Sequence, residues 1–220
     1  MIELKDNVIA SKATISRLPV YLRFLRDRLK AGEANVSSTV IAESMRLNPV
    51  QVRKDLALVS TAAGKPKLGF GVKELIESIE NFLGLGNTHD AVLCGVGSFG
   101  STLLKYEGFR NYGLNIVAAF DVNEDIVGKK INGVSVLAYS DLRKTVNRLN
   151  IKMGIITVPK DAAQAVADAM TDSGIRAIWN FAPTHLRLPD NVEIKNEDLA
   201  SSLAVLGKKL EDNLRKEEGN

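Results

Sequence analysis

Short apolar runs alternate with stretches of helical periodicity along the last two thirds of the chain. The apolar runs at 91–94, 115–120, 134–137, 153–158, 175–181 and 192–194 predict strands, and the segments 98–106, 141–149 and 161–171 predict helices between them. Because strands and helices alternate, the pattern predicts a mostly parallel, doubly wound sheet with helices on both faces, a Rossmann-like α/β fold.

The first third of the chain has helical periodicity that is interrupted by turn residues. A first helix is predicted over residues 14–30, with Pro19 marking or bending its first turns. The apolar stripe of this helix consists of Leu18, Leu22, Leu25 and Leu29. A short second helix follows, and Ser37 or Ser38 is suited to cap it.

A third helix carries a complete start signal. Asn48 can cap it, Pro49 suits its first position, and Gln51 can reach back to the cap. Its predicted core face consists of Val52, Leu56 and Val59. Two short helices joined by a tight turn at Arg46-Leu47 are typical of a helix-turn-helix, whose second helix enters the major groove of DNA.

Residues 64–71 follow the third helix and contain glycines and lysines, which predict the tip and return strand of a β-hairpin wing. The N-terminal part is therefore predicted to be a winged helix. The residues predicted to meet DNA are Arg46, Gln51, Arg53, Lys54, Lys65 and Lys67. A small helical domain with a solvated basic face is the alternative that the pattern leaves open.

The distribution of charge supports this division of the chain. Residues 1–73 contain 13 Lys and Arg against 6 Asp and Glu, a net charge of +7, whereas residues 74–220 contain 16 against 20, a net charge of −4. This asymmetry favours a nucleic-acid module joined to a neutral or acidic sensor or catalytic domain.

Helical periodicity over residues 73–83 ends at Gly84, where we place a domain boundary. The predicted domains are a winged helix over 1–84, a dinucleotide-binding domain over 85–197 and a C-terminal helix over 198–220. That last helix carries an apolar stripe of Leu199, Leu203, Leu206 and Leu210. The stripe either packs on its own chain or forms a homodimer by insertion between the domains of a partner chain, as a palindromic DNA site would require.

The strongest candidate for chemistry is a glycine-rich turn that follows the first predicted strand of the sheet. Gly95 permits a tight turn, Gly97 lets the backbone approach a pyrophosphate, and Gly100 lets the next helix sit close to the sheet. That helix begins near Ser98, so its free N–H groups and its dipole face the phosphates. Asp121 follows Gly100 by 21 residues, at the end of the second apolar run.

This spacing predicts a dinucleotide site for NADH or NAD⁺. Asp121 is placed to accept hydrogen bonds from the ribose hydroxyls, and its charge would repel a 2′-phosphate, which favours NAD over NADP. Thr157 and Pro159 end a later strand at the same sheet edge and are expected to border the cofactor. The turn also contributes Val96 and Phe99.

Composition excludes several other classes of protein. The 220 residues include one cysteine and two histidines, so neither an intramolecular disulfide nor a metal site is expected. No long apolar span or signal-peptide pattern is present, so a cytoplasmic protein without a membrane partner is expected.

At this level of detail the chain resembles one family, the redox-sensing transcriptional repressor Rex. The resemblance covers nearly the whole chain. It is carried by the segments 14–18, 21–23, 51–56, 95–100, 106–109, 119–122, 156–159, 174–176, 180–183 and 196–199. It implies a homodimer that represses transcription from operator DNA and releases the DNA when NADH binds, and so senses the NADH/NAD⁺ ratio.

The same resemblance implies a switch. Tyr106 would lie at the reduced cofactor and bond to Asp198 of a second copy, whereas in the form that binds DNA Asp198 would pair with Arg23 of the winged helix. A carboxylate and a phenol can distinguish the charged nicotinamide of NAD⁺ from the neutral one of NADH.

Two other functions remain open. An NAD-dependent oxidoreductase would use His185 or Tyr106 as its acid or base, but the chain after residue 200 has no room for a substrate domain. A thiol redox sensor would use Cys94, although its position at a strand end suits a small buried residue. The expected protein is therefore not an enzyme.

Overall fold

The computed structural model describes residues 10–60, 69–85 and 89–218 of the chain. Its contacts group the chain into two compact units, Met1–Asn87 and Thr88–Asn220, which we call unit 1 and unit 2. The finer division into three domains, with boundaries after residues 84 and 197, stays a prediction.

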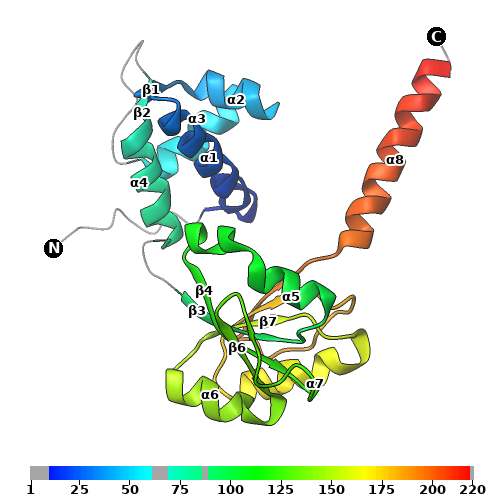
Figure 1. Cartoon of the computed structure of the whole chain (residues 1–220). Helices are drawn as coiled ribbons and strands as arrows, with labels where there is room; N and C mark the ends of the chain where they lie inside the picture. Colours follow the sequence, from blue (N-terminus) through cyan, green and yellow to red (C-terminus); the bar gives the residue numbers. More distant parts are fainter. Residues whose placement is uncertain (1–9, 61–68, 86–88, 219–220) are drawn as a thin grey trace. The chain divides into compact units, whose positions relative to one another are not determined.

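The described part of unit 1 consists of four helices and a small antiparallel sheet (Figure 1). Its elements are α1 (Lys12–Lys30), β1 (Asn35–Val36), α2 (Ser38–Met45), α3 (Pro49–Val59), β2 (Phe70–Gly71) and α4 (Val72–Leu83). Helix α1 packs against α4, α2 packs against α3, and β1 pairs with β2. The predicted helices of this part are therefore confirmed. Strand β2 ends the segment predicted as the wing but pairs with β1, and residues 61–68 of that region lie outside the described residues, so the wing stays a prediction.

The caps explain where the helix-turn-helix begins and turns. Ser37 Oγ accepts a hydrogen bond from the N–H of Val40 at 3.1 Å, and Asn48 Oδ1 accepts one from the N–H of Val50 at 2.8 Å. Between the two helices, Arg46 has the left-handed φ of 54° that ends α2. The predicted capping box is wrong, because the Gln51 amide points forward along α3 and leaves the cap to Asn48 alone.

The core of unit 1 follows the predicted periodicity. Its fully or nearly fully buried apolar residues include Leu18, Leu22, Leu25, Ile41, Val52, Leu56, Val59, Leu75 and Ile79. The predicted stripe of α1 is one residue too long, since Leu29 in the last turn is 44% exposed. The other three leucines of that stripe are buried and hold α1 in the core.

Unit 2 is built on a seven-stranded sheet with the order β5-β6-β4-β3-β7-β8-β9. Its strands are β3 (His89–Cys94), β4 (Leu114–Asp121), β5 (Lys130–Ile131), β6 (Val134–Ala138), β7 (Met153–Ile156), β8 (Ala177–Asn180) and β9 (Glu193–Asn196). All pair in parallel except β5 with β6. The chain leaves β3 toward β4 on one side and later returns to β7 on its other side, so the topological switch point lies between β3 and β7.

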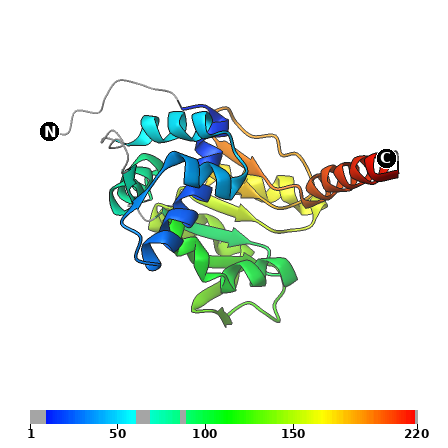
Figure 2. The same cartoon turned by 90° about the horizontal axis from the view of Figure 1, so that it is seen from above.

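Helices cover both faces of this sheet, as predicted (Figures 1 and 2). Helices α6 (Leu142–Leu149) and α7 (Lys160–Asp172) pack on one face, around Val92 and Phe120. Helix α5 (Ser98–Lys105) and the 3₁₀ helix η1 (Glu107–Tyr112) lie between β3 and β4 in the chain. Helix α5 packs on the opposite face, around Leu93 and Ala119.

One strand of the seven-stranded sheet, β5, and the small strand β1 of unit 1 were not predicted. The antiparallel strand β5 precedes β6 and joins it through Asn132 and Gly133, whose φ angles are 48° and 83°. Such a pair of positive φ values is the geometry of a two-residue hairpin turn, for which Asn-Gly is the preferred sequence. The dipeptide was therefore a readable signal for the extra strand. A second short 3₁₀ helix, η2 (Tyr139–Asp141), leads from β6 to α6.

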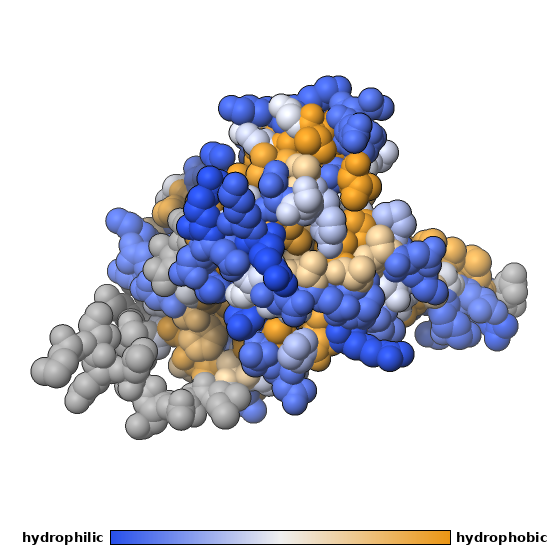
Figure 3. All heavy atoms as spheres, turned by 90° about the horizontal axis from the view of Figure 1, so that it is seen from below, coloured by the Kyte–Doolittle hydropathy of each residue, from blue (hydrophilic) through white to orange (hydrophobic). Residues whose placement is uncertain are grey.

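The C-terminal helix α8 (Leu199–Glu218) is confirmed as a helix, and its apolar side is exposed. The exposed fraction is 68% for Leu203, 63% for Leu206 and 58% for Leu210. In the space-filling view of Figure 3, apolar (orange) surface lies next to hydrophilic (blue) surface at α8. The stripe therefore does not pack on the described part of its own chain. No helix among the described residues is both long enough and apolar enough to cross a membrane.

Candidate dinucleotide site and nucleic-acid interface

The glycine turn has the backbone geometry that its sequence predicts. Gly95 has a φ of +98°, and a Cβ at that residue would lie 2.8 Å from the carbonyl carbon of Thr157. A Cβ on Gly100 would lie 2.0 Å from the Gly95 oxygen, so α5 approaches the turn more closely than any other residue type allows. A Cβ on Gly97 would meet nothing within 4 Å, because that side of the turn is open.

Asp121 ends β4 beside this turn. Its Oδ2 accepts a hydrogen bond from the N–H of Val96 at 2.6 Å, and its Oδ1 accepts one from the N–H of Asn123 at 2.8 Å. A carboxylate has about four acceptor positions, so two remain for hydroxyl groups of a ligand. The residue expected to bind ribose thus also holds the glycine turn.

A cavity of about 730 Å³ lies at the carboxyl ends of β3, β4 and β7, at the switch point. Its volume suits a small-molecule or cofactor site. The predicted residues that line it are Gly95, Gly97, Ser98, Phe99, Asp121, Thr157 and Pro159. The open backbone at Gly97, the start of α5 at Ser98 and the carboxylate of Asp121 fit the pyrophosphate and the ribose of a dinucleotide.

Three predicted cofactor residues do not line the cavity. Val96 and Gly100 instead support its wall, through the bond to Asp121 and through the close approach of α5. Tyr106 follows α5 and is 58% exposed. It touches Phe109, the first of a series of ring contacts through Trp179 and Phe181 to Phe99 on the cavity wall, with centroid distances of 4.7–5.4 Å.

Several residues of the lining were not predicted. They include Val122, Tyr139, Ala162, Phe181 and Pro183. Tyr139 directly follows β6 and Phe181 directly follows β8, so both lie, like Thr157, at the edge formed by the carboxyl ends of the strands. Residues that directly follow parallel strands border the ligand site in such folds, and this rule, applied to every predicted strand, predicts both residues.

The buried amide of Asn180 joins this wall to the segment that enters α8. Its Nδ2 donates to the oxygens of Thr184 at 2.9 Å and of Asn196 (Oδ1) at 2.8 Å, and its Oδ1 accepts from the N–H of Ala182 at 3.0 Å. The Asn180 carbonyl also accepts a hydrogen bond from the N–H of Glu197. The chain around the cavity residues Phe181 and Pro183 is therefore bonded to the segment that leads into the C-terminal helix.

The residues required by the two alternative functions are poorly placed. The cavity lining includes neither His185 nor Tyr106, the acid or base proposed for an oxidoreductase. Cys94 lines the cavity but is 1% exposed, and burial, together with the charge of Asp121, raises the pKa of its thiol. A thiol kept protonated is a weak nucleophile, so the structure does not favour a thiol sensor.

The outer face of α3 is the candidate nucleic-acid interface. Arg53 and Lys54 are exposed on this helix, and Arg46 is exposed on the turn before it. Gln51 is also exposed, but its amide donates to Asp55 Oδ1 at 2.9 Å. Lys65 and Lys67, predicted on the wing, lie outside the described residues.

A buried carboxylate anchors α3 to α1. Asp55 has a side chain that is 1% exposed, and Arg17 binds it through Nε at 2.6 Å and Nη2 at 2.8 Å. Tyr21 donates its hydroxyl to Asp55 Oδ2 at 2.8 Å, and Thr14 donates to Oδ1 at 3.2 Å. Sequence reasoning missed this cluster, although Arg17, Tyr21 and Asp55 all stand in the segments that carry the family resemblance.

The pKa values of the cluster follow from these bonds. Burial alone would raise the pKa of Asp55, but the hydrogen bonds from Arg17, Tyr21 and Gln51 outweigh burial and lower it. Burial and the bond to Asp55 raise the pKa of Tyr21 to about 12. The cluster therefore consists of an ionised Asp55, a charged Arg17 and a neutral Tyr21 near neutral pH.

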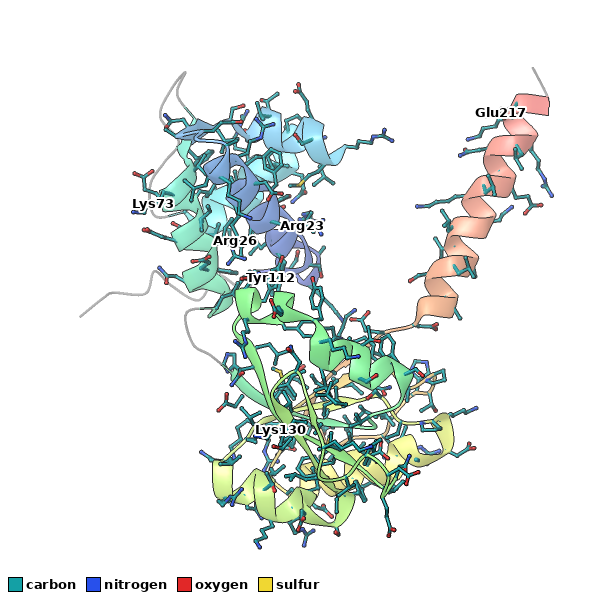
Figure 4. All side chains as sticks on the ribbon, viewed as in Figure 1. Arg23, Arg26, Lys73, Tyr112, Lys130 and Glu217 are labelled. Atoms are coloured by element: carbon teal, nitrogen blue, oxygen red, sulfur yellow. The ribbon has the colours of Figure 1, made fainter. Side chains whose placement is uncertain are left out.

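The three predicted switch residues occur in both units. Arg23 is exposed on α1, beside Arg26, whose guanidinium binds Glu80 at 2.8 Å (Figure 4). Asp198 is exposed at the start of α8, where its Oδ1 accepts a hydrogen bond from the N–H of Ser201 at 2.8 Å. The pairing of these residues with one another and with Tyr106 stays a prediction.

Family models match both parts of the chain. A "CoA binding domain" model matches residues 87–184, and a model described as "Putative DNA-binding protein N-terminus" matches residues 10–57. Within the described residues, the first covers the sheet from β3 to β8 and the second covers α1 through most of α3.

The chain is similar along nearly its whole length to curated proteins named redox-sensing transcriptional repressor Rex. The protein of Bacteroides fragilis is 39% identical, with 96% of each chain covered. That of Desulforamulus reducens is 43% identical, with 89% of this chain and 92% of the relative covered.

Solved structures agree with these relatives. The Rex-family repressor RSP in complex with β-NAD⁺ and operator DNA is 35% identical, with a TM-score of 0.86 over 97% of this chain and 99% of that one. RSP in complex with β-NADH is 33% identical, also with a TM-score of 0.86, over 97% of this chain and 100% of that one. The predicted fold class is thereby confirmed. This chain belongs to the Rex family of redox-sensing transcriptional repressors.

Proposed function

We propose that this protein is an NADH-responsive repressor: a homodimer that binds palindromic operator DNA and releases it when NADH occupies the cavity. The observation that carries the proposal is the presence, in one chain, of a dinucleotide cavity at a switch point and an exposed basic helix in a helix-turn-helix. RSP, whose structure is closely similar, has been solved with β-NADH and with β-NAD⁺ and operator DNA.

The proposal gives the cofactor a signalling role. NADH carries a neutral nicotinamide and NAD⁺ a positive one, so a protein can shift between two forms if each form favours one charge. His185, one of the two candidates for the acid or base of an oxidoreductase, does not line the cavity, which supports regulation over turnover. The exposed leucines of α8 support a homodimer, because an apolar stripe of this kind is stabilised when a second copy covers it.

The switch proposed here uses Tyr106, Asp198 and Arg23. With NADH bound, Tyr106 would bond to Asp198 of the second copy; without it, Asp198 would pair with Arg23. The ring contacts from Phe99 to Tyr106 support this idea, because they join the cavity wall to Tyr106 by direct packing.

Operator binding is expected to respond to NADH and not to the same concentration of NAD⁺. An operator gel shift, titrated separately with the two cofactors, measures this directly. NADH should release the DNA, because only the neutral nicotinamide favours the form that does not bind. DNA affinity that ignored NADH would refute the proposed function.

Substitutions in the DNA-binding helix and in the cofactor site are expected to have separate effects. Arg53→Ala or Lys54→Ala should weaken operator binding by roughly tenfold, within the 1–3 kcal/mol range of one good DNA contact, and leave NADH binding intact. Asp121→Ala should weaken NADH binding and leave operator binding intact, since it removes a cofactor ligand from unit 2. DNA binding by fluorescence anisotropy and NADH binding by calorimetry separate the effects. Loss of both activities in each variant would contradict the division into reader and sensor.

A further inference from the structure

The peptide that joins Gly95 to Val96 is held on both of its polar groups. Its carbonyl oxygen accepts a hydrogen bond from the Thr157 hydroxyl at 2.6 Å. Its N–H donates to Oδ2 of Asp121 at 2.6 Å. Thr157 follows β7 and Asp121 ends β4, and these two strands flank β3, from which the peptide emerges. Both neighbouring strands thus set the rotation of one peptide plane.

The rotation of this peptide controls the surface presented to a phosphate. The next residues are Gly97 and Ser98, whose N–H groups open α5 and have no partners within the helix. A rotated Gly95 carbonyl would also meet α5, because its oxygen lies 2.0 Å from the position of a Cβ on Gly100. The direction of these N–H groups therefore depends on how the Gly95–Val96 peptide is held.

Thr157 is itself anchored in this structure. Its N–H donates to the Cys94 oxygen at 2.9 Å, and its hydroxyl lies 3.0 Å from that oxygen and 2.6 Å from the Gly95 oxygen. The hydroxyl carries one proton, and the shorter contact is the one to Gly95. A threonine at a strand end, held by its own backbone, can thus fix a neighbouring turn.

We propose that Thr157 is a positioning residue for the dinucleotide: its hydroxyl and Asp121 together clamp the Gly95–Val96 peptide and thereby aim the amides that bind the pyrophosphate. The inference rests on the proposed function, because it requires that the cavity bind NADH. It assigns to Thr157 a role through the glycine turn, in addition to its place in the cavity lining.

The test compares Thr157→Val, which removes the hydroxyl at nearly constant shape, with Thr157→Ser, which keeps it. Loss of one such hydrogen bond predicts that the Kd for NADH rises about fivefold to tenfold in Thr157→Val. Thr157→Ser should stay within about twofold of the parent chain. Thr171→Val is the matched control, because its hydroxyl also donates to a backbone oxygen, that of Asp168, but lies outside the cavity lining.

A second probe separates the clamp from direct contact with the nicotinamide. ADP-ribose contains the pyrophosphate but lacks nicotinamide, so the clamp predicts the same fold loss of affinity for ADP-ribose as for NADH. Calorimetry on the full chain measures both, below the melting temperature of each variant. A loss confined to NADH would overturn the proposal, as would unchanged affinity in Thr157→Val or equal losses in the Ser and Val variants. If the parent chain binds neither probe, the proposed function fails together with the clamp.

Discussion

Asp55→Ala is expected to lower the free energy of unfolding of unit 1 by about 3 kcal/mol, at the lower end of the range for breaking a buried ion pair. Asp55 is 1% exposed at its side chain and binds Arg17, Tyr21, Thr14 and Gln51. Its removal leaves the Tyr21 hydroxyl and the Arg17 guanidinium without their acceptor. We expect a loss at the lower end because the Arg17 side chain is 24% exposed, so its guanidinium can bond to water once Asp55 is removed.

Urea unfolding of the full chain, followed by circular dichroism and by operator binding, measures the effect. Asp27→Ala is the control, since it removes an exposed carboxylate from α1 and should change stability by no more than about 0.5 kcal/mol. NADH binding by unit 2 should persist in both variants. If Asp55→Ala and Asp27→Ala had the same free energy of unfolding, the Asp55 cluster would not stabilise the fold.

The same cluster predicts how stability depends on pH. The pKa of Asp55 is lowered below its ordinary value of 3.8, so its stabilisation is present above that value and is lost as the pH falls through the folded pKa. The pKa of Tyr21 is raised from 10.0 to about 12, so its contribution is complete below pH 10 and is lost as the pH rises toward 12. The difference between the parent chain and Asp55→Ala should therefore shrink at both extremes.

Gly100→Ala is expected to reduce NADH affinity by at least tenfold, and to destabilise unit 2 as well. A methyl group at this position would lie 2.0 Å from the Gly95 oxygen and 2.9 Å from Thr157 Oγ1. Neither atom can yield without moving the turn or α5, and such overpacking costs about 1–3 kcal/mol. Calorimetric NADH titration and thermal melting of the full chain measure both effects.

Gly97→Ala is the matched comparison. Its methyl group would meet nothing within 4 Å in the free protein, and the φ of Gly97 is −68°, so the melting temperature should hardly change. NADH affinity should nevertheless fall, because the methyl group projects into the space that the pyrophosphate needs. If Gly97→Ala bound NADH normally, the phosphate would have to lie elsewhere.

Much of the dinucleotide site could be predicted because its requirements are local. Gly95 and Gly97 stand at the end of a strand, Ser98 opens a helix, and Asp121 ends the next strand, so sequence order and sheet topology together bring them to one edge. Tyr139 and Phe181 obey the same rule, because each directly follows a strand of the sheet, and both could have been predicted from it. The Asn132-Gly133 turn was a similar readable signal for β5.

The Asp55 cluster could not be predicted in the same way. Asp55 and Arg17 are 38 positions apart, and Gln51 could equally have bonded to the cap at Asn48. The tertiary structure decides the outcome, because it buries Asp55 beside donors from α1 and makes hydrogen bonds to that carboxylate worth more than a bond to an exposed cap.

The sequence by itself determined the order of helices and strands, the glycine turn and the division of charge, because periodicity, caps and turn residues act over a few neighbouring positions. Only the tertiary structure decided that Thr157 and Asp121 bond to the same peptide, that Asp55 is buried among donors, and that Leu203, Leu206 and Leu210 of α8 remain exposed. These features depend on which side chains distant segments bring together, and the free energy of burying or pairing them is set by that packing.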